Sequence, residues 1–395
     1  MSLHRNFILG SAHSFFTMFL VVVPVLVPFW LSLGLSMREI LEIQAIFGIA
    51  VALFEVPTGY VADMWGRRAS LIVGTFFSGV GFSILPFADT YWALVLFEVI
   101  VAFGGSFVSG ADIALVYDSL PQDANRLRRL GSLSQWALVG EAIAAIAASI
   151  LIAWSFTYIL WTQVIVAWIP FVLSWFFIEP PIQKMEHRSP FKNCWSVARF
   201  ILVEDPLLRL IFLNSLIWGL SSFCIVWLLQ PYWTQEGIPL EYFGILWSAL
   251  MFVAAGASKW THVLERWLGA SGILITLALS ACLGYFLMAF AGGGIGVIAG
   301  ILFYVNRGLA SVIFTDAFNW KIPSAFRATA NSLRSFAFRL SYGLIGPLTG
   351  LVIERYDLSA ALGSLGVFYT LLLGVTLLPL CKQMQEIKGD YIPAE

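Results

Sequence analysis

The sequence carries little charge. Only 11% of its 395 residues are Asp, Glu, Lys or Arg, whereas a soluble globular chain carries about 25% charged residues. A buried core does not explain a deficit of this size, because 59% of the residues are hydrophobic. The net charge of −1 offers no broad basic surface, so we expect no nucleic-acid partner. The composition predicts an integral membrane protein.

The sequence also lacks the common motifs of catalysis and metal binding. It has no GxSxG, HExxH or GxxxxGK pattern, and its four cysteines show neither CxxC nor Cys/His spacing. We therefore predict no catalytic residues, no metal, no cofactor and no enzymatic activity. The cysteines are expected to be free thiols. The first apolar run is too long for the core of a cleaved signal peptide.

What the sequence has instead is a series of long apolar runs. They do not alternate in polarity, so helices are favoured over barrel strands. Each of twelve runs is long enough to cross a bilayer. The predicted spans are 6–33, 38–62, 70–88, 91–117, 131–153, 157–178, 206–233, 240–264, 270–290, 295–318, 329–353 and 358–380. We predict an all-α membrane fold of twelve helices.

Only one connection between these runs is long. It covers residues 179–205, begins with Pro180 and Pro181, and predicts a linker between an N-terminal six-helix bundle (1–178) and a C-terminal one (206–395). A short helix at the membrane surface is expected near 194–203. Basic residues fall almost entirely on one side of the predicted spans, which places the linker and both termini in the cytoplasm.

The two halves contain a repeated segment. Residues 108–132 read VSGADIALVYDSLPQDANRLRRLGS, and residues 307–332 read RGLASVIFTDAFNWKIPSAFRATANS. Both run from a small residue through an apolar stretch to Asp, then proline, arginine and serine. Repeated halves are typical of transporters, whose sites lie between the halves near the membrane midplane.

The loop after the second predicted helix, within FEVPTGYVADMWGRR, could be a simple anchor at the membrane surface or a moving part of a gate. Gly59 would let the helix approach a neighbour, Gly66 would permit a tight turn, and Arg67 and Arg68 would anchor the loop at lipid headgroups. Asp63 does not fit a simple anchor, because a carboxylate beside anionic lipid needs a partner such as a helix N-terminus.

The spacing Gly59-x-x-x-Asp63-x-x-Gly66-Arg67-Arg68 resembles the signature loop of the major facilitator superfamily in its bacterial form. The resemblance implies two six-helix bundles in the bacterial inner membrane. It also implies that Asp63 faces the start of helix 11 and that a loop arginine pairs with Asp118. The implied gating residues are Gly59, Asp63, Gly66, Arg67, Arg68 and Asp118. The matching region 256–269 departs from the pattern, with Trp260 near the place of Asp63.

Ionisable residues inside the predicted spans are candidate sites, because burying charge in a membrane is costly. The candidates for substrate or proton binding are Glu55, Glu98, Asp112, Glu141, Arg307 and Arg339. A carboxylate removed from water favours its protonated form, so it can bind and release protons. The alternative for each acid is a fixed ion pair that only holds helices together. Arg334 is expected near the membrane surface.

These observations predict a secondary active transporter that moves a small organic solute by alternating access. Proton coupling is expected, and efflux is favoured slightly over import of a metabolite or siderophore-like compound. A non-transporting membrane sensor is the alternative of another class. Many proton-driven exporters carry a glycine and proline signature on helix 5, and here a similar pattern, Gly343 to Gly350, lies on helix 11 instead. We expect a monomer whose partners are the solute, protons and membrane lipid.

Overall fold

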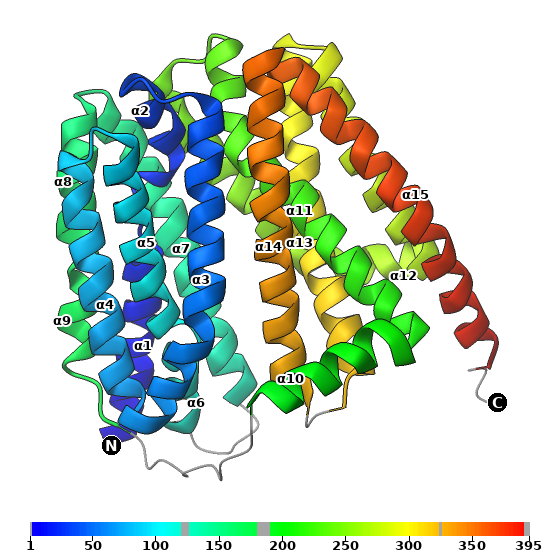
Figure 1. Ribbon diagram of the computed structural model, residues 1–395, viewed down its shortest axis with the longest axis horizontal. Helices are drawn as coiled ribbons and strands as arrows, with labels where there is room; N and C mark the ends of the chain where they lie inside the picture. Colours follow the sequence, from blue (N-terminus) through cyan, green and yellow to red (C-terminus); the bar gives the residue numbers. More distant parts are fainter. Residues whose placement is uncertain (1, 120–125, 180–189, 324–325, 391–395) are drawn as a thin grey trace. The chain divides into compact units, whose positions relative to one another are not determined.

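The computed structural model describes residues 2–119, 126–179, 190–323 and 326–390, which contain helices and no strand (Figure 1). In these residues, nine helical segments are long and apolar enough to cross a membrane. One of them, Leu240–Phe290, contains two predicted spans, and Gly269 interrupts it with a φ of 69°. The predicted all-α architecture is confirmed.

Helices cover all six predicted spans in the first half of the chain, although three of these spans are interrupted. Their bounds are α1 Ser2–Thr17, α2 Leu26–Ser32, α3 Met37–Trp65, α4 Arg67–Ile84, α5 Tyr91–Val108, α6 Ala111–Ser119, α7 Arg126–Ile152, α8 Phe156–Ala167 and α9 Ile169–Ser174. In the second half they are α10 Pro190–Arg199, α11 Pro206–Gln235, α12 Phe243–Phe290, α13 Gly293–Lys321, α14 Arg327–Arg355 and α15 Leu358–Asp390.

Three predicted spans are broken rather than continuous. The run 6–33 contains α1, the 3-10 turn Val23–Val25 with Pro24, and α2. The run 91–117 divides into α5 and α6 at Gly110, whose φ of 80° favours glycine. The run 157–178 divides into α8 and α9 just before Pro170, which cannot donate a helical hydrogen bond. Apolar length predicts a span, but not where its helix is interrupted.

A helix is present near 194–203, and its expected position at the membrane surface stays a prediction. α10 ends at Arg199 and continues as a π-helical turn, Phe200–Glu204. Asp205 then begins α11, because its side chain accepts a hydrogen bond from the N–H of Leu208 at 2.9 Å. The same carboxylate pairs with Lys321 at the end of α13, 3.1 Å away.

The chain divides into two compact units. Unit 1 is Met1–Glu186 with Gly237–Ala249, and unit 2 is His187–Glu236 with Leu250–Glu395. In unit 1, α5 packs against both α3 and α4 (Figure 1). Gly74 of α4 and Gly104 of α5 meet so closely that a methyl group on Gly104 would lie 2.6 Å from the carbonyl oxygen of Gly74. Small residues allow this approach where lipid supplies little hydrophobic drive between helices.

In unit 2, α11 is the central helix and packs against α13, α14 and α15. The hydroxyl of Tyr285 donates to the carbonyl of Ser221 at 2.6 Å, and the ring of Tyr285 stacks on Tyr369. The buried thiol of Cys224 lies 3.4 Å from the Tyr369 hydroxyl. These contacts satisfy polar groups in the interior of the unit.

Candidate functional site

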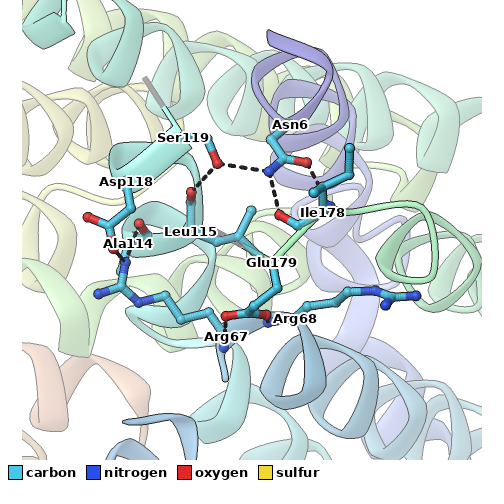
Figure 2. A network of polar contacts seen from close by, with 9 residues as sticks. All are labelled: Asn6, Arg67, Arg68, Ala114, Leu115, Asp118, Ser119, Ile178 and Glu179. Carbon is cyan, nitrogen blue, oxygen red and sulfur yellow. Dashed lines mark hydrogen bonds and ion pairs between the residues drawn. The ribbon is translucent and has the colours of Figure 1, made fainter. Parts of the chain in front are cut away.

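The entrance to α4 in unit 1 carries a cluster of charged groups. Gly66 precedes the helix with a φ of 96°, a conformation that side chains rarely adopt. The guanidinium of the next residue, Arg67, pairs with the carboxylate of Asp118 on α6 and donates to the carbonyl of Ala114 (Figure 2). The pairing implied by the family resemblance is therefore present within unit 1.

Glu179, which follows α9, completes this cluster. Its two carboxylate oxygens accept hydrogen bonds from the backbone N–H groups of Arg67 and Arg68, at 2.8 and 2.7 Å (Figure 2). A carboxylate at this place caps the free N–H groups of α4 and faces the positive end of the helix dipole. We call Arg67, Asp118 and Glu179 the α4 entry cluster.

A second set of polar contacts lies beside the α4 entry cluster. The fully buried amide of Asn6, on α1, donates to the hydroxyl of Ser119 at 2.8 Å and to the carbonyl of Ile178 at 2.7 Å. Its oxygen accepts from the N–H of Ile178 at 2.9 Å (Figure 2). Asn6 therefore joins α1, α6 and the segment after α9 at the end of the unit where the α4 entry cluster lies.

The other predicted gating residues behave differently from one another. Arg68 donates to the carbonyl of Trp175 at 2.8 Å, near the end of α9. Gly59 is exposed, and a methyl group there would meet no atom within 4 Å among the described residues. The adjacent Thr58 is buried and donates to the carbonyl of Ser106 at 2.9 Å, and the close approach expected at Gly59 stays a prediction. Asp63 lies within α3, but its side chain is outside the described residues, so its partner stays a prediction.

The predicted acidic residues of unit 1 lie on four helices. Glu55 of α3 accepts a hydrogen bond from the hydroxyl of Ser109 at 3.4 Å, at the junction of α5 and α6. Asp112, in the first turn of α6, accepts from the N–H of Ile113 at 2.7 Å. Both acids lie near the break in the fourth predicted span, where Gly110 interrupts the helix.

The remaining two acids, Glu98 and Glu141, each contact a polar group on another helix. Glu98 of α5 is only 5% exposed and accepts from the amide of Gln44 on α3 at 2.8 Å. Glu141 of α7 is half-buried and lies 3.5 Å from the indole nitrogen of Trp247, also in unit 1. Each acid thus has a polar partner on another helix, an arrangement that suits either bracing or proton binding.

Unit 2 contains a cavity with two arginines. Its volume is about 390 Å³, within the range of small-ligand sites. Arg307 of α13 and Arg334 of α14 line it, and neither has a carboxylate partner among the described residues. Their guanidinium groups lie against aromatic rings, at 5.9 Å from Tyr304 and 5.2 Å from Phe318. We call this space the arginine cavity.

Two buried polar groups also line the arginine cavity. The hydroxyl of Ser222 and the indole N–H of Trp218, both on α11, have no hydrogen-bond partner among the described residues. Ser222 is 5% exposed and Trp218 is 1% exposed. Buried donors without partners are uncommon and mark places where a ligand or water completes the bonding. The walls of the cavity therefore contain two positive charges and two residues whose buried polar groups have no partner among the described residues.

Sequence reasoning missed part of both arrangements. Arg334, expected near the membrane surface, lines the cavity together with Arg307. Arg339 lies further along α14, and its Nε is 3.4 Å from the hydroxyl of Ser335. Glu179 was assigned to the linker, although an acid among so many basic residues was a signal that it binds a partner. Asn6 gave the weaker signal of one amide in an apolar run.

Comparison with protein families decides what this helical arrangement is. The family model described as Major Facilitator Superfamily matches residues 7–344. The chain belongs to the major facilitator superfamily. It is therefore a multi-pass integral membrane protein, and the resemblance of the α4 loop is confirmed at the level of the family.

Curated relatives within the superfamily match only parts of the chain. The inner membrane transport protein YajR of Escherichia coli (strain K12) is 25% identical over 132 residues, which are 33% of this chain and 28% of YajR. The uncharacterized MFS-type transporter YxaM of Bacillus subtilis (strain 168) is 31% identical over 88 residues, 22% of each chain. The matched regions thus span less than a third of either relative.

Solved structures match over the whole chain. The nucleoside transporter NupG has a TM-score of 0.77 at 16% identity, over 96% of this chain and 99% of NupG. A bacterial homolog of the human lysosomal transporter Spinster, in an inward-facing and unoccupied conformation, has a TM-score of 0.72 at 17% identity, over 100% and 99%. At these identities the likeness establishes the superfamily fold alone.

Proposed function

We propose that this protein is a secondary active transporter of a small organic anion, working by alternating access and coupled to protons. The observation that carries the proposal is the arginine cavity. Arg307 and Arg334 present guanidinium groups, which bind carboxylate or phosphate through paired hydrogen bonds. Ser222 and Trp218, whose buried polar groups have no partner among the described residues, belong to the same cavity wall. A neutral solute would leave both guanidinium groups without a counter-charge.

Proton coupling is proposed for the carboxylates of unit 1. Asp112, Glu141, Glu55 and Glu98 lie on α6, α7, α3 and α5, inside predicted spans, where ionisable residues are candidates for a functional role. Asp112 and Glu55 are the stronger candidates on geometry, because both lie at the break between α5 and α6. A helix interruption is a place where a small rearrangement changes the exposure of a carboxylate.

The α4 entry cluster is proposed as part of the cytoplasmic gate. Arg67, Asp118 and Glu179 join α4, α6 and the end of α9 through contacts that a rotation of these helices would break. The alternative is that the cluster only anchors the loop. We further propose that both termini lie in the cytoplasm of a bacterial inner membrane and that the protein works as a monomer.

Flux in proteoliposomes tests the function. Purified protein is reconstituted, a pH gradient is imposed in either direction, and a panel of organic anions, cations and neutral solutes is offered. We expect saturable movement of one or more anions that depends on the gradient. We propose that the solute moves out in exchange for protons that move in down their gradient. Solute movement in the same direction as the protons would instead support import. Absence of protein-dependent flux for every anion, with flux of a neutral or cationic solute, would overturn the anion assignment.

A further inference from the structure

A second cavity in unit 2 has no role in the proposed transport site. It has a volume of about 400 Å³, and its walls come from α11, α12, α13 and α15. Most of the lining is apolar, including Ile211, Ile273 and Leu380. The titratable groups in the lining are Glu265, Asp316 and His262. No lysine or arginine lines it among the described residues, so we call it the acidic cavity.

The repeat in the chain explains why this cavity exists. Gly66 of unit 1 and Gly269 of unit 2 both turn the chain into a helix, with φ and ψ of 96° and 155° in one and 69° and 169° in the other. The residue after Gly66 is Arg67, and the residue after Gly269 is Ala270. The turn is therefore repeated at an interval of 203 positions (269 − 66), a different register from the one that places Trp260 near Asp63, and the arginine that follows the turn is not repeated.

The acid that pairs with this arginine is repeated as well. Asp316 follows Asp118 by 198 positions (316 − 118), and Val312 follows Ala114 by the same interval (312 − 114). In unit 1, Arg67 binds the Asp118 carboxylate and the Ala114 carbonyl. In unit 2, the counterparts of those groups line the acidic cavity together with Ala270. The cavity occupies the place that an arginine side chain fills in unit 1.

Asp316 and Glu265 are both exposed residues, and His262, which is also exposed, is the titratable base in the described lining. Neither Asp316 nor Glu265 forms an ion pair or a hydrogen bond in the described part of the chain. Trp320 contributes an aromatic face to the wall, and such faces attract cations. A carboxylate pair beside apolar walls favours a ligand with a positive head and an apolar body.

We infer that the acidic cavity binds an amphipathic organic cation, with a guanidinium or ammonium head at Asp316 and an apolar body against α12 and α15. The bound head would connect the Gly269 turn to α13, as Arg67 connects the Gly66 turn to α6. This site differs from the arginine cavity because it selects a cation, whereas the arginine cavity is proposed to bind an anion. Its occupation is measured by binding alone, so it does not depend on the proposed transport function.

The probe for this site is n-hexylguanidinium, and n-hexylurea is its uncharged control. Binding is followed by the thermal midpoint of the purified protein in nanodiscs over a concentration series of each compound. We expect a saturable rise with the cation and none with the urea. Asp316→Asn should weaken binding at least 10-fold, because the paired charge is lost. Glu204→Gln, a surface carboxylate paired with Arg199, is the matched control and should bind as the wild type does.

Ala270→Arg places an arginine directly after Gly269, as Arg67 directly follows Gly66. We expect it to abolish probe binding, since the new guanidinium would occupy the cavity and pair with Asp316. Should this variant fail to fold, Ala270→Leu fills the same space without charge and should also exclude the probe. Equal affinity for the probe in wild type, Asp316→Asn and the filled variants would overturn the inference.

The cation could come from solution or from the amine of a lipid headgroup. Nanodiscs of phosphatidylcholine alone are therefore compared with nanodiscs that contain phosphatidylethanolamine. Unchanged probe affinity between the two supports a soluble cation, and weakened affinity in the second supports competition by the lipid amine. Either result requires that Asp316→Asn removes the binding. Binding that is insensitive to Asp316→Asn in both lipid mixtures contradicts the site.

Discussion

The carboxylate of Glu179 holds the backbone N–H of Arg67, 112 residues earlier in the chain, at 2.8 Å. This contact fixes the end of one predicted span to the beginning of another. It also places an acid against the positive end of α4 while the Arg67 side chain turns away toward Asp118. The entrance of α4 is thus stabilised from two sides, by one anion on its backbone and another on its side chain.

Removing the charge of Glu179 should loosen the first turn of α4. In Glu179→Gln, one amide oxygen replaces two carboxylate oxygens that accept from Arg67 and Arg68. We expect a loss of roughly 1–2 kcal/mol in local stability. Hydrogen exchange measured by mass spectrometry should show faster exchange at the start of α4. Exchange as slow as in wild type, and as slow as in the Glu204→Gln control, would mean that the cap contributes nothing.

A double-mutant cycle on Arg67 and Asp118 should separate a gate from an anchor. The pair is partly exposed, at 27% and 35%, so we expect a coupling of only about 0.5–1 kcal/mol in unfolding free energy. A gate also predicts coupling in the transport rate of Arg67→Gln, Asp118→Asn and the double variant. If the two substitutions are coupled in unfolding free energy but strictly additive in their effects on the transport rate, the pair only anchors the loop.

The packing of α4 on α5 offers a comparison between neighbouring glycines. In Gly104→Ala the new methyl group would lie 2.6 Å from the Gly74 carbonyl oxygen and from the backbone nitrogen and the hydroxyl oxygen of Ser78. Overpacking of this kind costs about 1–3 kcal/mol. Gly105→Ala meets open space and should stabilise the helix by roughly 0.5–1 kcal/mol. Equal thermal midpoints for the two variants would contradict the close approach of these helices.

Proton coupling makes a prediction for the carboxylates of unit 1. Asp112→Asn, Glu55→Gln and Glu141→Gln keep the shape of each side chain but cannot take up a proton. We expect at least one to abolish flux driven by a pH gradient while solute exchange without a gradient continues. That separation distinguishes a coupling residue from a structural one, which would impair both modes. Gradient-driven flux that is unchanged in all three would end the assignment of coupling to these acids.

Much of the fold could be predicted from the sequence, because apolar length and charge bias are local properties. The spans 206–233 and 358–380, for example, coincide with α11 and most of α15. The breaks at Gly110 and Pro24 were not predicted. A glycine or proline in an apolar run permits an interruption without requiring one, and packing of neighbouring helices determines which occurs.

The candidate sites were less predictable, because they depend on which helices meet. The pairing of Arg67 with Asp118 came from the resemblance of the loop, and no spacing rule connects residues so far apart. The contacts of Glu179, assigned to the linker, and of Arg334 were not predicted, since sequence gives depth along a helix but not the direction of a long side chain. The proposed roles of Glu55, Asp112, Glu141, Arg307 and Arg339 stay predictions.

The most direct test of the central claim is the KM for the transported anion in Arg307→Gln. Loss of one charge-assisted contact costs about 1.5–3 kcal/mol, which corresponds to a rise in KM of roughly 10- to 100-fold. Arg209→Gln, an exposed arginine on α11, is the matched control and should leave KM unchanged. A KM in Arg307→Gln equal to that of wild type and of the control would contradict anion binding in the arginine cavity.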